Sequence, residues 1–208
     1  CIMKSTVSPY RYWNGFREGI PIGLGYLSVS FGFGISTVGQ GLRAAEAVLI
    51  SMTNLTSAGQ VAGVAVIAAG GTVIEMILTQ LVINLRYALM GISMTQRLDA
   101  RAKPWRMRML LCWALTDEIY AAAVTKPDVI GPSYLWGLMT APYIGWTTGT
   151  LLGAAVGSES ISALWESKPI NVLTCLAFLA VATWVAYGGI DATEKVQIVL
   201  VSFQMIML

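Results

Sequence analysis

Two neighbouring carboxylates, Asp117 and Glu118, are the residues of this sequence best suited to carrying protons. They lie inside an apolar segment, residues 109–124, with no basic residue beside them. Burial in a medium of low dielectric raises the pKa of a carboxyl group, so that the group can take up a proton near neutral pH. We therefore expect proton coupling at Asp117 or Glu118, with Glu75 as a third candidate. The alternative is that these acids only hold the structure together.

A second set of polar side chains lies in the apolar segment 72–94. If this segment is a helix, Glu75, Thr79 and Arg86 lie on one side of it. Gln80 and Asn84 lie on the opposite side. A helix that is polar on two sides needs protein or water around it. Arg86 also needs a counter-ion, for which Asp117 or Glu118 is suited, unless its long side chain reaches the membrane surface instead.

A third set interrupts the apolar region 44–70 with hydroxyl and amide groups, at Thr53, Asn54, Thr56, Ser57 and Gln60. In hydrocarbon, such a stretch is tolerated only where it faces protein or a water-filled cavity. It predicts two half-helices that meet at a polar centre. The amino ends of half-helices attract carboxylates, so a zwitterionic amino acid fits this centre. The alternative is a hydrated kink with a purely structural role.

The composition indicates which elements position these groups. Of 208 residues, 56% are hydrophobic and only 12% are charged, whereas soluble domains carry about 25% charged residues. The sequence therefore predicts one all-α domain over residues 1–208, a polytopic transmembrane helix bundle of six to seven spans. We expect a broken or re-entrant second region and apolar segments at residues 20–40, 44–70, 72–94, 109–124, 134–156, 170–187 and 196–208, the last shorter than a full crossing.

Basic residues cluster in two places, before the first span and in the loop after the third. The first cluster contains Lys4, Arg11 and Arg17, and the loop contains Arg97, Arg101, Lys103, Arg106 and Arg108. Short basic segments stay on the cytoplasmic side of a membrane, so we expect both clusters there. A re-entrant second region gives the even number of crossings that this topology requires.

Glycines recur at every fourth position late in the sequence, at Gly145, Gly149, Gly153 and Gly157. This spacing places them along one stripe of a helix, where another backbone can approach closely. The stripe predicts a contact with another helix of this chain or with a partner subunit. We expect Pro142 to interrupt the same segment.

Several classes of function are excluded by what the sequence lacks. It contains no histidine, which removes Ser-His and Cys-His catalysis and most zinc sites. It has no phosphate-binding loop and no cysteine pair with metal-ligand spacing. We therefore expect no enzyme activity, no cofactor and no metal, and a net charge of +2 gives no reason to expect a nucleic-acid partner.

Several motifs then occur in a characteristic order. These are Phe16-Arg17-Glu18-Gly19, Ser57-Ala58-Gly59-Gln60, Asn84-Leu85-Arg86-Tyr87 and Thr116-Asp117-Glu118. In this order they resemble the AzlC family, the large subunits of bacterial branched-chain amino-acid exporters. The resemblance covers about residues 15–157. Ser28 stands where the family usually has a proline, and residues after 158 do not follow the usual family ending.

The resemblance implies a multi-pass secondary transporter of the bacterial inner membrane. Its substrates would be valine, leucine and isoleucine, with methionine as a further candidate, and its partner a small AzlD-type membrane subunit. The predicted substrate-binding residues are Thr53, Asn54, Thr56, Ser57 and Gln60, with Asn84 and Arg86 holding the substrate carboxylate or an internal network. The alternative function is a non-transporting membrane scaffold or assembly subunit.

Overall fold

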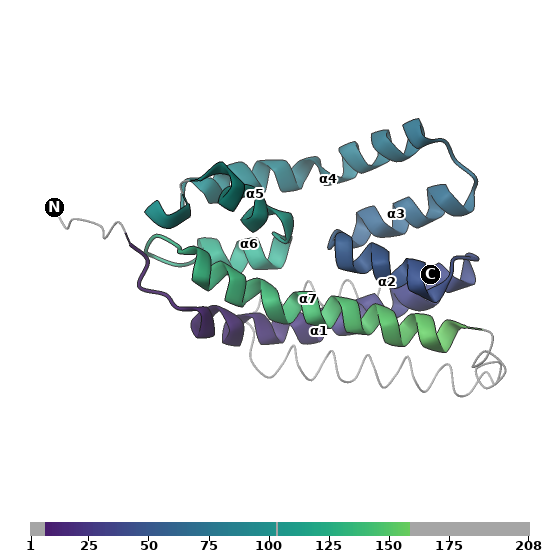
Figure 1. Ribbon diagram of the computed structural model, residues 1–208, viewed down its shortest axis with the longest axis horizontal. Helices are drawn as coiled ribbons and strands as arrows, with labels where there is room; N and C mark the ends of the chain where they lie inside the picture. The colour runs from purple at the N-terminus through teal and green to yellow at the C-terminus, as the bar shows by residue number, and fades with distance from the viewer. Residues whose placement is uncertain (1–6, 103, 159–208) are drawn as a thin grey trace. The chain divides into compact units, whose positions relative to one another are not determined.

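The computed structural model describes residues 7–102 and 104–158 of the chain, and the expected spans at 170–187 and 196–208 lie outside these residues. The described part is helical and contains no strand, as predicted, although Leu98 and Ile130 form one isolated bridge. Its elements (Figure 1) are α1 Tyr12–Gly39, α2 Ala44–Thr53, α3 Ser57–Ala68, α4 Val73–Thr95, the short 3-10 helix η1 Ala100–Ala102, α5 Trp105–Trp113, α6 Asp117–Val124 and α7 Pro132–Gly157. Among these, α1 and α4 are long and apolar enough to cross a membrane.

The chain divides into two compact units. Unit 1 consists of Cys1–Ile22 with Asn54–Tyr143, and unit 2 consists of Gly23–Thr53 with Ile144–Leu208. Helices α1 and α7 contribute residues to both units, whereas α3, α4, α5 and α6 belong wholly to unit 1. Most of the predicted site residues therefore belong to unit 1.

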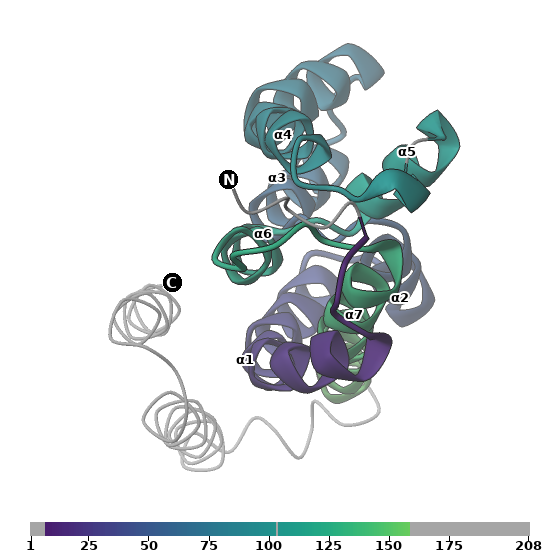
Figure 2. The same ribbon diagram turned by 90° about the vertical axis from the view of Figure 1, so that its left-hand side faces the viewer.

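In unit 1, α3 and α4 form a hairpin that Figures 1 and 2 both show. The turn is specified locally, because Gly70 adopts a φ of 67° that suits glycine, and the Gly71 amide donates to the Val66 carbonyl at 2.8 Å. Thr72 and Glu75 then begin α4 with reciprocal side-chain and backbone hydrogen bonds. Glu75 is thus engaged in capping a helix, while its predicted role in proton coupling is not tested by this geometry.

The expectation of one continuous span over residues 109–124 is wrong. The structure has two short helices there, α5 and α6, separated by residues 114–116. Asp117 and Glu118 consequently lie in the first turn of α6 rather than in the middle of a span. The physical reason is that Thr116 precedes two acids, and acids in a first turn interact favourably with the helix dipole. Hydropathy cannot detect this break because the residues before it are apolar.

The prediction that Pro142 interrupts its segment is also wrong, because α7 continues through it. A proline removes the amide that would bind the carbonyl four residues earlier, which here is that of Leu138. In unit 1, Gly19 of α1 lies against this Leu138 carbonyl, and a Cβ added at Gly19 would come within 2.5 Å of the oxygen. The glycine therefore lets α1 approach the part of α7 that the proline disturbs.

In unit 2, the glycine stripe forms the predicted contact, and its partner is a helix of the same chain. Gly145, Gly149 and Gly153 of α7 each lie against a backbone carbonyl of α1. The carbonyls belong to Gly23, Leu27 and Phe31, in that order. Any larger side chain on this stripe would push the two backbones apart.

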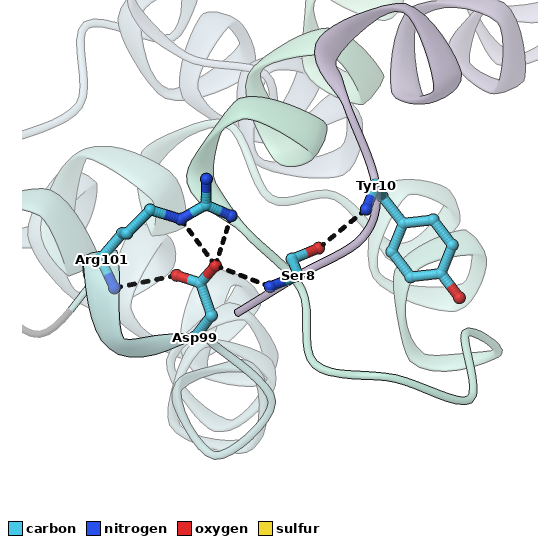
Figure 3. A network of polar contacts seen from close by, with 4 residues as sticks. All are labelled: Ser8, Tyr10, Asp99 and Arg101. Atoms are coloured by element: carbon cyan, nitrogen blue, oxygen red, sulfur yellow. Dashed lines mark hydrogen bonds and ion pairs between the residues drawn. The ribbon is translucent and has the colours of Figure 1, made fainter. Parts of the chain in front are cut away.

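At one end of unit 1, a buried carboxylate joins the N-terminal segment to the basic loop (Figure 3). Asp99 Oδ2 accepts hydrogen bonds from the Ser8 amide at 3.2 Å and from Arg101 Nη2 at 2.6 Å. Its other oxygen accepts from the Arg101 amide at 2.9 Å. The two segments expected to be on the same side of the membrane are thus together in unit 1, and their cytoplasmic location stays a prediction.

Burial of the Asp99 side chain opposes its ionisation, but the hydrogen bonds from Arg101 and Ser8 outweigh this effect. As a result, the pKa of Asp99 is lowered from its ordinary value of 3.8. A carboxyl group whose pKa is lower in the folded state stabilises the fold at pH values above 3.8. That contribution is lost as the pH falls through the lower, folded-state pKa.

We expect Asp99→Asn to destabilise the protein by about 1–3 kcal/mol at pH 7, toward the lower end because Arg101 is half exposed. The difference in melting temperature between variant and wild type should shrink as the pH approaches and passes below 3.8. Thermal unfolding of the detergent-solubilised protein over pH 3–7 measures this. Glu46→Gln, which removes an exposed ion pair with Arg43, is the control and should have little effect. A pH-independent loss in Asp99→Asn would contradict the assignment.

Candidate functional site

Two helices of unit 1, α3 and α6, begin after breaks that have the same local sequence. The break between α2 and α3 ends in Leu55-Thr56, and the break between α5 and α6 ends in Leu115-Thr116. Each leucine is buried, and each threonine precedes a helix without capping it through its side chain. Both breaks therefore present the amino end of a helix, where the backbone N–H groups attract negative charge.

The first break is held in shape by amide side chains. Asn54 Oδ1 accepts hydrogen bonds from the Thr56 hydroxyl at 2.7 Å and from the Thr56 amide at 3.1 Å. Gln60, which is buried, donates from Nε2 to the Asn54 carbonyl. These bonds satisfy polar groups that the interrupted helix leaves open, as an apolar environment requires.

A relay of amides then links α3 to α4. Gln80 Nε2 donates to the Gly59 carbonyl at 2.7 Å, and Asn84 Nδ2 donates to Gln80 Oε1 at 2.9 Å. Because a carbonyl can only accept, the Gly59 oxygen fixes which atom of each amide is the donor. The relay ends at Asn84 Oδ1, which is buried and has no hydrogen-bond partner among the described residues. Leaving such an acceptor unsatisfied costs about 1–3 kcal/mol.

The glycine at position 59 is required by this arrangement. A Cβ there would lie 2.5 Å from Thr56 Oγ1, 3.0 Å from Gln80 Oε1 and 3.1 Å from Asn84 Oδ1. The absence of a side chain lets three polar groups converge on the first turn of α3.

A pocket of about 180 Å³ lies where the two breaks meet α4. We call it the two-break pocket, and its walls are the two Leu-Thr pairs, Asn84 and Tyr87 of α4, and Cys112 and Trp113 of α5. At roughly 30 Å³ per water molecule, it has the scale of a small amino acid rather than of a nucleotide. Apolar walls with a few convergent polar groups are typical of small-molecule sites.

A larger hollow of about 490 Å³ lies at the turn between α3 and α4. Its only ionisable lining residue is Glu75, which is already engaged in the cap of α4. It lacks the convergent polar groups of the two-break pocket. The smaller pocket is therefore the better candidate site.

Beside the two-break pocket, Arg86 forms the ion pair expected from the sequence. Its Nη1 lies 2.7 Å from Asp117 Oδ2, and its Nη2 donates to the Tyr87 hydroxyl at 2.9 Å. The guanidinium also lies over the Tyr87 ring, 4.8 Å from its centre. The prediction of a counter-ion from the fourth apolar segment is confirmed, and the counter-ion is Asp117.

Comparisons with known proteins agree with the motifs noted in the sequence. A family model described as AzlC protein matches residues 21–159, a range that includes every residue of the two-break pocket. The chain belongs to the AzlC family. The relatives described below are named as membrane proteins.

Curated relatives of this AzlC-family chain come from bacteria and an archaeon. It is 29% identical over 153 residues to Inner membrane protein YgaZ of Escherichia coli, covering 71% of this chain and 61% of the relative. It is 29% identical to an uncharacterized membrane protein of Archaeoglobus fulgidus (70% and 64% covered) and 28% identical to one of Helicobacter pylori (72% and 68% covered). The chain thus spans under two thirds of the first two relatives. No solved structure matches it.

The structure gives the predicted substrate residues of this AzlC-family chain different positions. Thr56 and Asn84 line the two-break pocket, whereas Asn54 and Gln60 hold the break beside it. Ser57 begins α3, and Thr53 ends α2 with its hydroxyl bonded to the Leu49 carbonyl. Binding of substrate by these residues stays a prediction.

Sequence reasoning missed the pocket walls contributed by α4 and α5, namely Tyr87, Cys112 and Trp113. It also missed that Leu55 and Leu115 face the same pocket. The repeated Leu-Thr pair, each before a helix start, was the signal that could have revealed the second break.

We expect Arg86→Ala to lower the melting temperature, because it leaves Asp117 without its ion-pair partner. Arg86→Ala with Asp117→Asn should recover part of that loss, giving a coupling of order 1 kcal/mol in a double-mutant cycle. The matched control is the exposed pair Arg43 and Glu46, for which the same cycle should give about half that coupling or less. Strictly additive losses at Arg86 and Asp117 would show that the pair contributes no coupling.

Proposed function

We propose that this chain is the large subunit of a secondary transporter that exports branched-chain amino acids and binds them in the two-break pocket. The observation that carries the proposal is that the residues before two helix starts, those of α3 and α6, line one small pocket with both apolar and polar walls. Secondary transporters form their substrate sites from discontinuous helices whose amino ends face the carboxylate of the substrate. Membership of the AzlC family supports the same reading.

The walls of the pocket suit an aliphatic side chain. Leu55 and Leu115 are almost completely buried, and Trp113 adds a large apolar surface. Transfer of an aliphatic side chain from water into such walls is favourable by about 25 cal/mol per Å² of apolar surface removed from water. This supports valine, leucine and isoleucine, with methionine as a further candidate, over polar amino acids.

The amino ends of α3 and α6 differ in how well each could bind the carboxylate group of a substrate. The first turn of α6 already contains Asp117 and Glu118, whereas the first turn of α3 contains no acid. A substrate carboxylate is therefore favoured at α3, where the helix dipole is not already matched by negative side chains. In this proposal Arg86 acts through its ion pair with Asp117 and does not hold the substrate directly.

Proton coupling is the part of the proposal that concerns Asp117, Glu118 and Glu75. Asp117 is bound to Arg86, and Glu75 is bound to Thr72 at the start of α4. Asp117 and Glu118 share the first turn of α6, directly after the pocket residue Thr116, and this position supports a coupling role for the pair. The ion pair between Arg86 and Asp117 lies beside the pocket, so a change in the charge of a carboxylate there would alter the electrostatic potential at the substrate.

The proposal includes a small AzlD-type partner and a bacterial inner-membrane location with several crossings. Helix α4 supports a lipid or protein environment, because it exposes large apolar side chains along its length, among them Ile74, Leu81 and Val82. Such a surface is unfavourable in water but suits hydrocarbon or another transmembrane helix.

Counterflow in proteoliposomes tests the proposed function. We expect vesicles containing the full chain and its small partner, preloaded with unlabelled leucine, to accumulate labelled leucine faster than vesicles without protein. Valine and isoleucine should compete, whereas lysine and glutamate should not. Absence of counterflow from correctly folded protein would favour the scaffold function instead.

Glu118→Gln should leave counterflow largely intact but abolish the stimulation of export by a pH gradient. Gln keeps nearly the same volume and hydrogen-bonding capacity but cannot titrate. The measurement compares leucine export with and without an imposed pH gradient. Asp128→Asn is the control and should keep the stimulation. If Glu118→Gln is still driven by pH, and Asp117→Asn is as well, the proton-coupling role is refuted.

A further inference from the structure

The amide relay of α4 ends in Asn84, a lining residue of the two-break pocket, and the hydrogen bonds of the relay determine which atom of this amide is left over. Asn84 lines the pocket, and its Nδ2 donates to Gln80, while Oδ1 is buried and has no partner in the described part of the chain. Rotation of the Asn84 amide by half a turn would place its oxygen against Gln80 Oε1, another acceptor. Rotation of Gln80 as well would place an oxygen against the Gly59 carbonyl. The relay therefore offers an acceptor, and never a donor, at its free end.

The hydrogen bonds around the first break leave this acceptor open. The Thr56 hydroxyl, which also lines the pocket, donates to Asn54 Oδ1 and is thus already committed. Gly59 contributes no side chain, and the Asn84 oxygen lies 3.1 Å from the position where its Cβ would be. A buried acceptor is normally satisfied, so its partner is expected to come from what enters the pocket.

We propose that Asn84 is a specificity-determining residue that accepts a hydrogen bond from the ammonium group of the substrate. This rests on the proposed function, because it assumes that the pocket holds an amino acid. An ammonium group carries N–H donors only, and a charged donor makes a stronger hydrogen bond than a neutral one. Gln80 is a positioning residue that holds the Asn84 amide in the required orientation.

This assignment predicts a specific order among analogues with the same carbon skeleton. Leucine presents an ammonium group, 2-hydroxy-4-methylpentanoate presents a hydroxyl group that can donate once, and 4-methyl-2-oxopentanoate presents only an acceptor. The oxo acid would place an oxygen against the Asn84 oxygen. Sites built to bond a donor discriminate strongly against analogues without it. We expect the oxo acid to bind at least tenfold more weakly than leucine, with the hydroxy acid between them.

The experiment measures competition by the three compounds for labelled leucine on the full chain with its small partner. Asn84→Leu has nearly the same size but no acceptor, so it should weaken leucine binding about 10- to 100-fold. It should not weaken oxo-acid binding, because it removes the oxygen that opposes the oxo group of that compound. The ratio between the two compounds should therefore fall toward one, which a merely structural role for Asn84 would not produce. Thr148→Val is the control, because this hydroxyl bonds only to carbonyls of its own helix.

Competition measured on the wild-type protein alone also tests the inference. The test therefore remains decisive if Asn84→Leu fails to fold. Equal binding of leucine and the oxo acid by the wild type would overturn the role of Asn84. It would not contradict the proposal that the pocket binds compounds with the carbon skeleton of leucine. Unchanged discrimination in folded Asn84→Leu would overturn it as well, and would indicate that a water molecule satisfies the Asn84 oxygen. Failure of folded wild-type protein to bind leucine at all would instead refute the proposed function and the inference with it.

Discussion

The need to satisfy backbone polar groups at interrupted helices is the constraint on which the structure of unit 1 depends. Hydrocarbon cannot hydrogen-bond to the carbonyls and amides that a break exposes. At the first break, the Asn54 carbonyl is satisfied by Gln60, and the Thr56 amide by Asn54 Oδ1. The polar stretch that suggests a binding site in the sequence thus first stabilises its own backbone. The groups that remain for a substrate are fewer, and they lie around the two-break pocket.

Helix α4 serves both breaks because its polar residues lie on two sides. On one side, Gln80 and Asn84 join it to the first turn of α3, and on another, Arg86 joins it to Asp117 at the start of α6. A change at either break is therefore transmitted to α4 through directional bonds rather than through apolar packing alone. The cap formed by Thr72 and Glu75 fixes where α4 begins, and hence where these side chains lie along it.

The sequence predicted the elements whose signals are local or periodic. The placement of polar side chains on two sides of α4 followed from the helical period of 3.6 residues. The glycine stripe of α7 followed from the spacing of four residues between its glycines. The second break was not predicted, since Cys112 to Leu115 are apolar and contain neither glycine nor proline. The amide relay could not be predicted either, because the pairing of Gln80 with the Gly59 carbonyl depends on how α3 packs on α4. The orphan oxygen of Asn84 is visible only once that relay is known.

An amino acid carries its ammonium and carboxylate groups on one carbon, so a site for it needs a donor and an acceptor close together. In the proposed site, the first turn of α3 would supply the donors, because this helix has no side-chain cap and no acid in that turn. Asn84 supplies the acceptor at the same turn, 3.1 Å from the Cβ position of Gly59. In this proposal the side chain of the substrate would lie toward Leu55 and Leu115, whose burial favours a branched aliphatic group over a polar one.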